Sequence, residues 1–218
     1  MINFRINHMK KTATILILSI LQFFCNYSQR NTTENTKIET EDSLKKNLTP
    51  NRPIIGLIYE SENIRIYGDT TIQKDKIGYS SLKFEPYISF DDYKVSRIDH
   101  KRHAELNLNS NKFARNFRTR LREGYSADTA NFAGHYTFVY WGCGSPCQSS
   151  LLIDRQTGKV YDSPCASLGY DFRVDSRMLI VNPPDTNGFY DDCFYCKPII
   201  YIFDEKTKTF NERQPKIK

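Results

Sequence analysis

The chain has 218 residues, of which 13% are aromatic, and its formal net charge is +6. The first 28 residues hold three basic side chains and no acidic one, so the rest of the chain carries 28 basic and 25 acidic side chains. A net charge of +3 in that part is far weaker than nucleic-acid-binding domains usually have, and we expect no nucleic acid among the partners.

The N-terminus has the pattern of a cleavable bacterial signal peptide, which we place at residues 1–28. Lys10 and Lys11 precede an apolar run from Ala13 to Phe24. This run is too short to cross a bilayer, because a transmembrane helix needs about 20 residues. A buried core helix is the alternative interpretation. The signal predicts an exported protein, either periplasmic or extracellular.

Two further predictions concern the residues after the apolar run. Cleavage near Ser28 competes with lipid attachment at Cys25, which would make the chain an outer-membrane lipoprotein and provide its only attachment to a membrane. Residues 29–52 are polar and have little to bury, so we expect them to form a disordered tether.

Residues 53–218 predict a single β-rich globular domain. Short runs rich in β-branched and aromatic residues, bounded by turn residues, indicate strands. In chain order the runs are Pro53–Glu60, Asn63–Tyr67, Tyr87–Val95, His135–Trp141, Ser150–Ile153, Lys159–Tyr161, Phe172–Val174, Arg177–Val181, Ile199–Phe203 and Thr209–Phe210. The His135–Trp141 run is apolar at both alternating sets of positions, which favours a central strand. Gly158 can supply the positive φ that the tight return into Lys159–Tyr161 needs.

One amphipathic helix is predicted, over Asn111–Glu123, because Phe residues and a Leu recur there at every fourth position. Ser110 can cap it and Gly124 can end it. The fold class is therefore expected to be α+β, mainly an antiparallel β meander or sheet with one packed amphipathic helix. A small propeller-like fold or an all-β sandwich is the alternative.

Four motifs between residues 131 and 177 resemble an uncharacterised family of exported bacterial proteins. They are NFAGHY at 131–136, WGCGSPCQ at 141–148, TGKVY at 157–161 and DFRVDSR at 171–177. The resemblance implies secretion and a compact β-rich fold. It implies no activity and no catalytic residue.

The segment between Trp141 and Gln148 is the most unusual part of the sequence. Its two cysteines, Cys143 and Cys147, predict a structural disulfide, because an exported protein meets an oxidising environment. A second interpretation makes one of them a catalytic nucleophile with His135 as its base. We also expect Trp141, Ser145 and Gln148 to form a rigid binding loop.

Three more cysteines leave further alternatives open. Cys193 and Cys196 can form structural disulfides, either with each other or with a more distant cysteine. They can instead join Cys143 and Cys147 in a zinc site of four thiolates, or form a redox pair of their own. Their acidic neighbours argue against redox activity, because acidic neighbours raise a thiol pKa. Cys165 can pair with any of the others, since spacing alone does not establish connectivity.

Three other groups of residues are candidate binding sites. The predicted helix carries five cations, which suit either an anionic partner or a solvated face; we favour the solvated face. Asp185, Asn187 and Asp191 surround a glycine turn and are weak calcium candidates. His100 and His103 lie three residues apart in a polar run that we expect to be a loop. The five cations are Lys112, Arg115, Arg118, Arg120 and Arg122.

The function that these residues favour is an exported or envelope-attached binding module without catalysis or cofactor. Its partner would be a protein or a cell-envelope ligand, and an inhibitor or immunity role fits its size and export. An envelope hydrolase that uses His135 with Cys143 or Cys147 is the alternative. A structural zinc-binding protein is a further one.

Overall fold

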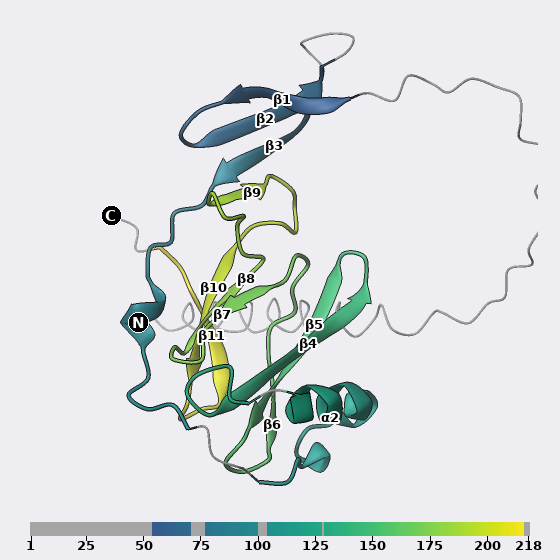
Figure 1. Cartoon of the computed structure of the whole chain (residues 1–218), viewed down its shortest axis with the longest axis vertical. Helices are drawn as coiled ribbons and strands as arrows, with labels where there is room; N and C mark the ends of the chain where they lie inside the picture. The colour runs from purple at the N-terminus through teal and green to yellow at the C-terminus, as the bar shows by residue number, and fades with distance from the viewer. Residues whose placement is uncertain (1–53, 71–76, 100–103, 128, 216–218) are drawn as a thin grey trace, which may run out of the picture. The chain divides into compact units, whose positions relative to one another are not determined.

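A computed structural model describes residues 54–70, 77–99, 104–127 and 129–215 (Figure 1). The predicted signal peptide, Cys25, the tether and the pair His100 and His103 lie outside the described residues. Among the described residues, no helix is long and apolar enough to cross a membrane.

The strands form three sheets, and every strand pair within them is antiparallel. The first sheet has the order β1-β2-β3-β9, with β1 at Ile55–Glu60, β2 at Ile64–Asp69, β3 at Ile77–Lys83 and β9 at Phe189–Asp191. The second has the order β11-β10-β8-β7, with β7 at Tyr170–Phe172, β8 at Met178–Val181, β10 at Ile199–Asp204 and β11 at Thr209–Arg213. The third has the order β4-β5-β6, with β4 at Tyr136–Gly144, β5 at Cys147–Asp154 and β6 at Val160–Asp162.

The described helical segments are few and short. The α-helix α2 spans Arg118–Ala127, and three 3-10 helices are η1 at Phe90–Tyr93, η2 at Leu108–Ser110 and η3 at Ala114–Phe117. The antiparallel sheets and the one α-helix of the described residues confirm the predicted α+β class.

The β4–β5 hairpin is buried on both faces, and this explains its continuous apolar sequence. On one face Phe138 joins an aromatic cluster with Phe132 and Phe203, which links the third sheet to the second. On the other face Val139 packs with Leu121 of α2. We predicted a central strand here, yet β5 is the middle strand and β4 lies at one side of the hydrogen-bonded ladder. Covering layers, rather than strand neighbours, bury β4.

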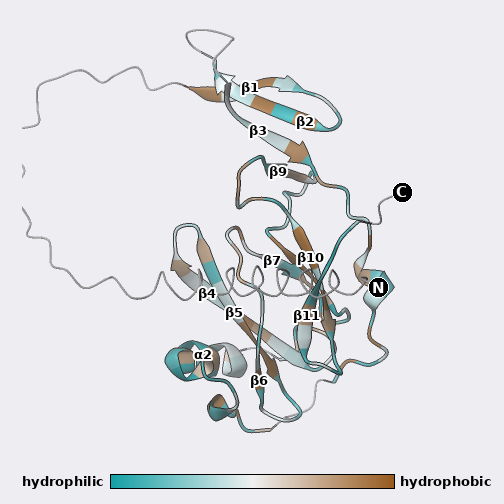
Figure 2. Ribbon diagram, turned by 180° about the vertical axis from the view of Figure 1, so that it is seen from behind, coloured by the Kyte–Doolittle hydropathy of each residue, from teal (hydrophilic) through white to brown (hydrophobic). Residues whose placement is uncertain are grey.

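The outer face of the second sheet is covered by the segment predicted as the strand Tyr87–Val95, and that prediction was wrong. The segment forms η1 instead, where the Asp92 carboxylate accepts a hydrogen bond from the Ser89 backbone N–H at 2.7 Å. This local bond replaces a strand ladder. Phe90 packs against Met178 and other apolar side chains of β8 and β10. Figure 2 colours part of the β10 ribbon as hydrophobic.

The predicted helix has different bounds in the structure. The helical segment begins with η3 at Ala114, and Asn111 rather than Ser110 binds backbone N–H groups near its start: the Asn111 Oδ1 accepts hydrogen bonds from the N–H groups of Phe113 at 2.8 Å and Ala114 at 3.0 Å. The Ser110 hydroxyl instead accepts from the Val160 N–H at 2.8 Å. At the other end the helix continues through Gly124 to Ala127.

Two glycines are required by close backbone approaches. A Cβ on Gly124 would lie 2.7 Å from the Val139 Cγ1, so this glycine lets α2 lie directly on β4. Gly158 has the predicted positive φ, +73°, and a Cβ there would lie 1.9 Å from the Glu105 carbonyl oxygen.

Strands β3 and β9 were not predicted; β9 has only three residues and forms by pairing with β3.

We expect Gly124→Ala to lower the free energy of unfolding by up to about 2 kcal/mol. Overpacking against Val139 costs about 1–3 kcal/mol, and the better helix propensity of alanine offsets about 1 kcal/mol of it. Ser126→Ala, at an exposed position of the same helix, is the control and should change stability by less than about 0.5 kcal/mol. Denaturant titration measures both, and a stabilised Gly124→Ala variant would contradict the close approach.

Candidate recognition surface

The tip of the β4–β5 hairpin is closed by a disulfide. Cys143 and Cys147 are bonded, with their Cα atoms 5.1 Å apart, as the sequence predicted. Between them Ser145 and Pro146 are exposed, and their peptide bond is cis. The tip therefore presents a short, covalently closed loop at one end of the buried hairpin.

The three predicted binding residues lie in different environments. The Trp141 side chain is 8% exposed and its ring centre lies 4.8 Å from that of Phe117, so the indole supports the hairpin from inside instead of meeting a partner. Gln148 is half-buried and its backbone exchanges two hydrogen bonds with Ala166, at 2.7 and 2.9 Å. Of the three, Ser145 is exposed. The reason is the pleat: Trp141 shares its face with Val139, which α2 covers.

A second disulfide, Cys193–Cys196, closes another short loop. The two residues between these cysteines are aromatic and exposed: Phe194 is fully exposed at 102%, and Tyr195 is 49% exposed. A bulky apolar side chain in water on a closed loop is the kind of feature that marks an interaction site, because its burial against a partner is favourable.

Asn182 holds this loop beside the segment that follows Cys165. Its buried side-chain Oδ1 accepts hydrogen bonds from the backbone N–H groups of Ser167 at 2.8 Å and Leu168 at 2.9 Å. Its Nδ2 donates to the Tyr195 carbonyl at 3.0 Å. One amide therefore places Leu168, which is 46% exposed, next to the Cys193–Cys196 loop.

The same segment also contacts the hairpin. The Tyr170 hydroxyl donates to the carbonyl oxygens of Gln148 at 3.0 Å and Pro164 at 2.9 Å, and its ring centre lies 5.5 Å from that of Tyr140. Tyr140 is 52% exposed. We use the name recognition surface for the exposed side chains of the hairpin, of the segment after Cys165 and of the Cys193–Cys196 loop, namely Tyr140, Ser145, Pro146, Leu168, Phe194 and Tyr195.

The cysteine pairs do not supply the thiol chemistry that the sequence left open. Zinc binding and nucleophilic attack both require a thiolate, and none of the described cysteines is a free thiol. The described residues also contain no group of three or more His, Cys, Asp or Glu side chains that could hold a metal ion. Cys193–Cys196 leads through Pro198 into β10, whereas a redox pair usually opens a helix.

His135 is far from either candidate nucleophile. It directly precedes β4, and Cys143 lies eight residues further along the same strand. At about 3.3 Å per residue the two are about 26 Å apart. The predicted pair of a histidine base with Cys143 or Cys147 is therefore not assembled.

The surroundings of His135 are structural. Its Nε2 lies 3.8 Å from the Asp154 Oδ1, which is too long for a hydrogen bond. That oxygen is already occupied, because it accepts the N–H groups of Gln156 at 2.8 Å and Thr157 at 3.3 Å in the β5–β6 turn. Burial lowers the pKa of His135; the acidic neighbours, led by Asp154, raise it, and Lys208 lowers it.

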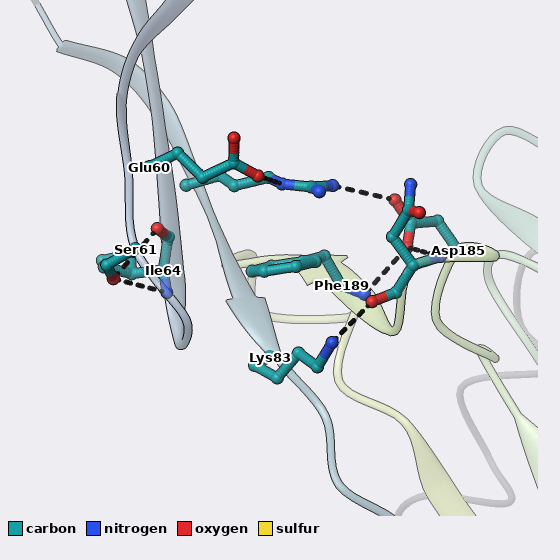
Figure 3. A network of polar contacts seen from close by, with 8 residues as sticks. Glu60, Ser61, Ile64, Lys83, Asp185 and Phe189 are labelled. Carbon is teal, nitrogen blue, oxygen red and sulfur yellow. Dashed lines mark hydrogen bonds and ion pairs between the residues drawn. The ribbon is translucent and has the colours of Figure 1, made fainter.

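The calcium candidates are exposed but make contacts within the protein, and Figure 3 shows those of Asp185. The Asp185 Oδ1 accepts the N–H groups of Asn187 and Phe189, each at 2.8 Å, and its Oδ2 lies 3.5 Å from the Arg65 Nη1. The Asn187 carbonyl accepts from the Lys83 ammonium at 2.7 Å. In addition, the Asp191 carboxylate accepts from the Ser81 hydroxyl at 2.9 Å. These oxygens tie the β9 region to β2 and β3 instead of converging on one cation.

The five cations of the helical segment are exposed, as the sequence predicted. Four of them, Lys112, Arg115, Arg118 and Arg122, line a common groove, while Arg120 does not. Sequence reasoning placed these side chains on one element but gave no sign of the groove, because its other wall comes from residues 106–109.

Comparison of the chain with models of known protein families, with curated proteins and with solved structures gives no match. The function must therefore be argued from the surface itself. The two disulfides indicate an oxidising, exported environment.

We expect His135 to make the protein less stable in mild acid. Because the folded state holds its pKa below the ordinary 6.5, the unfolded chain takes up the proton first as the pH falls. The destabilisation that His135 causes is therefore absent above pH 6.5 and grows as the pH drops from 6.5 to the lowered pKa. Urea titrations between pH 7.5 and 5 should give a shallower fall for His135→Asn than for wild type; equal slopes would refute the assignment.

Proposed function

We propose that this protein is an exported binding module without catalysis, and that it recognises a protein partner through the recognition surface. The observation that carries the proposal is Phe194, whose side chain is fully exposed on a disulfide-closed loop that Asn182 clamps beside Leu168. We place the protein in the periplasm or outside the cell. An inhibitor or immunity role agrees with this kind of surface.

The rigidity of the surface supports binding. Two disulfides and a buried amide hold its loops, so little conformational freedom remains to be lost when a partner docks. Aromatic side chains are also the residues that most often dominate binding energy at protein interfaces. Phe194 and Tyr195 therefore have the properties of an anchor that enters a pocket on the partner.

The chemistry of the partner can be inferred from the charge pattern. From Thr129 to Ile153 the chain contains no Lys, Arg, Asp or Glu. Contacts to the hairpin end of the surface must then be apolar or must use neutral hydrogen bonds. Phe194 projects outward instead of lining a cavity, which suits a protein surface better than a small ligand. Contacts at the hairpin end should accordingly depend only weakly on salt.

Strand β1 is a rival surface, since Leu57, Ile58 and Tyr59 are also exposed. It lies at the edge of its sheet and pairs only with β2. Neither disulfide of the described residues closes a loop there, so β1 lacks the rigidity on which the proposal depends.

Site-specific crosslinking distinguishes the two surfaces. A photoreactive phenylalanine analogue at position 194 of the exported protein should give a discrete adduct with one partner, whereas the same analogue at position 59 should give none. Leu168→Asp should abolish the adduct at 194, because it puts a charge into the contact. An adduct from position 59 alone would move the site to β1, and adducts from neither position would refute the proposal.

The hairpin disulfide should contribute to shape more than to stability. Replacing both Cys143 and Cys147 with Ser should lower the free energy of unfolding by about 2 kcal/mol or less, because the closed loop has only five residues. The same variant should weaken partner binding through the mobility of the tip, measured by the yield of the position-194 adduct. Unchanged yield would exclude the tip from the site.

A further inference from the structure

A second surface, on the helical side of the molecule, has the opposite chemistry. Segments η2, η3 and the start of α2 enclose a groove of about 630 Å³. Its lining includes Lys112, Arg115, Arg118 and Arg122 together with three asparagines between residues 107 and 116, and no acidic residue. Figure 2 shows α2 coloured mainly as hydrophilic. A groove of this size can hold a small ligand.

The net charge of the chain is concentrated at this groove. From Glu105 to Glu123 there are five basic and two acidic side chains. The rest of the chain after residue 28 carries 23 basic and 23 acidic side chains, so its formal charge is zero. The whole positive excess of residues 29–218 therefore lies in this one segment of 19 residues. A solvated face made only for solubility would normally mix both signs.

The cations of the groove also repel one another. Arg115 and Arg118 are three residues apart, and Arg118 and Arg122 are four apart in the helix, spacings that place like charges side by side. Arg118 is the first residue of α2 and therefore lies at the positive end of the helix dipole. The first turn of α2 has no acidic residue that would offset this positive charge. No ion pair joins the four groove cations to an acidic residue in the part of the chain that the structure describes. An anion in the groove would relieve all of these repulsions.

We propose that this groove binds a phosphate-bearing ligand on a hydroxyl-rich scaffold, such as a phosphorylated saccharide or a phospholipid head group. Arginine forks and a lysine ammonium match phosphate oxygens, and four cations accommodate more than one negative charge. Asparagine amides both donate and accept, which suits hydroxyl groups. The groove lining contains no aromatic residue on which a base could stack, so single-stranded nucleic acid fits poorly.

This inference is independent of the proposed protein partner, because it uses different residues and a different ligand. Isothermal titration of the mature protein with myo-inositol hexakisphosphate tests it. Arg118→Gln with Arg122→Gln should weaken binding at least about tenfold, since each guanidinium contributes charge-assisted hydrogen bonds. The control is Arg120→Gln with Lys206→Gln, which has the same net charge, keeps one change on α2 and leaves the groove intact.

The groove variant should melt at the same temperature as wild type or higher, because repulsion is removed. A lower melting temperature would contradict the repulsion on which the inference rests. Equal loss of affinity in the control would show unspecific charge attraction and overturn the site. Flotation with vesicles of phosphatidylglycerol, but not phosphatidylcholine, would identify a lipid source, and binding in solution without flotation would identify a soluble one. Absence of both, or tighter binding to a single-stranded oligonucleotide, would refute the proposal.

Discussion

Burial of both faces of the β4–β5 hairpin is the constraint on which the other layers depend. Phe138 and Leu152 face one way, and Val139 and Leu151 face the other, and none of these four side chains is exposed to solvent by more than 8%. A two-stranded ribbon that is apolar on both sides is not stable alone in water. One side must be covered by the second sheet and the other by α2. The close approach of Gly124 to Val139 is a consequence of the second requirement.

The two ends of this hairpin have different roles because they meet different neighbours. At the His135 end the Asp154 carboxylate is occupied by backbone N–H groups of the turn. At the disulfide end the strands extend beyond the covering layers, so Tyr140 and Ser145 reach solvent. The exposure of the hairpin tip is a consequence of where the layers stop.

The molecule also separates charge from apolar exposure. The recognition surface carries exposed aromatic side chains, and its hairpin end comes from a segment without charged residues, whereas the groove beside α2 concentrates the positive excess of the chain. The buried contact between Phe117 and Trp141 lies between these regions, with Phe117 flanked in sequence by two groove residues. The two proposed ligand classes can therefore be tested separately. Contacts of the protein partner at the hairpin end should depend weakly on salt, and binding of the phosphate-bearing ligand should depend strongly on it.

Sequence patterns by themselves determined the elements whose signals are local. The turn at Gly158, the hairpins β5–β6 and β10–β11, the Cys143–Cys147 disulfide and the α+β class all depend on residues close together in the chain. Tertiary structure alone decided three things: that Trp141 points inward, that the region around Phe90 forms a 3-10 helix, and that Asn182 hydrogen-bonds the backbone of both Leu168 and Tyr195. Each depends on which layer or side chain from a distant segment covers that position, and periodicity carries no information about contacts between distant segments.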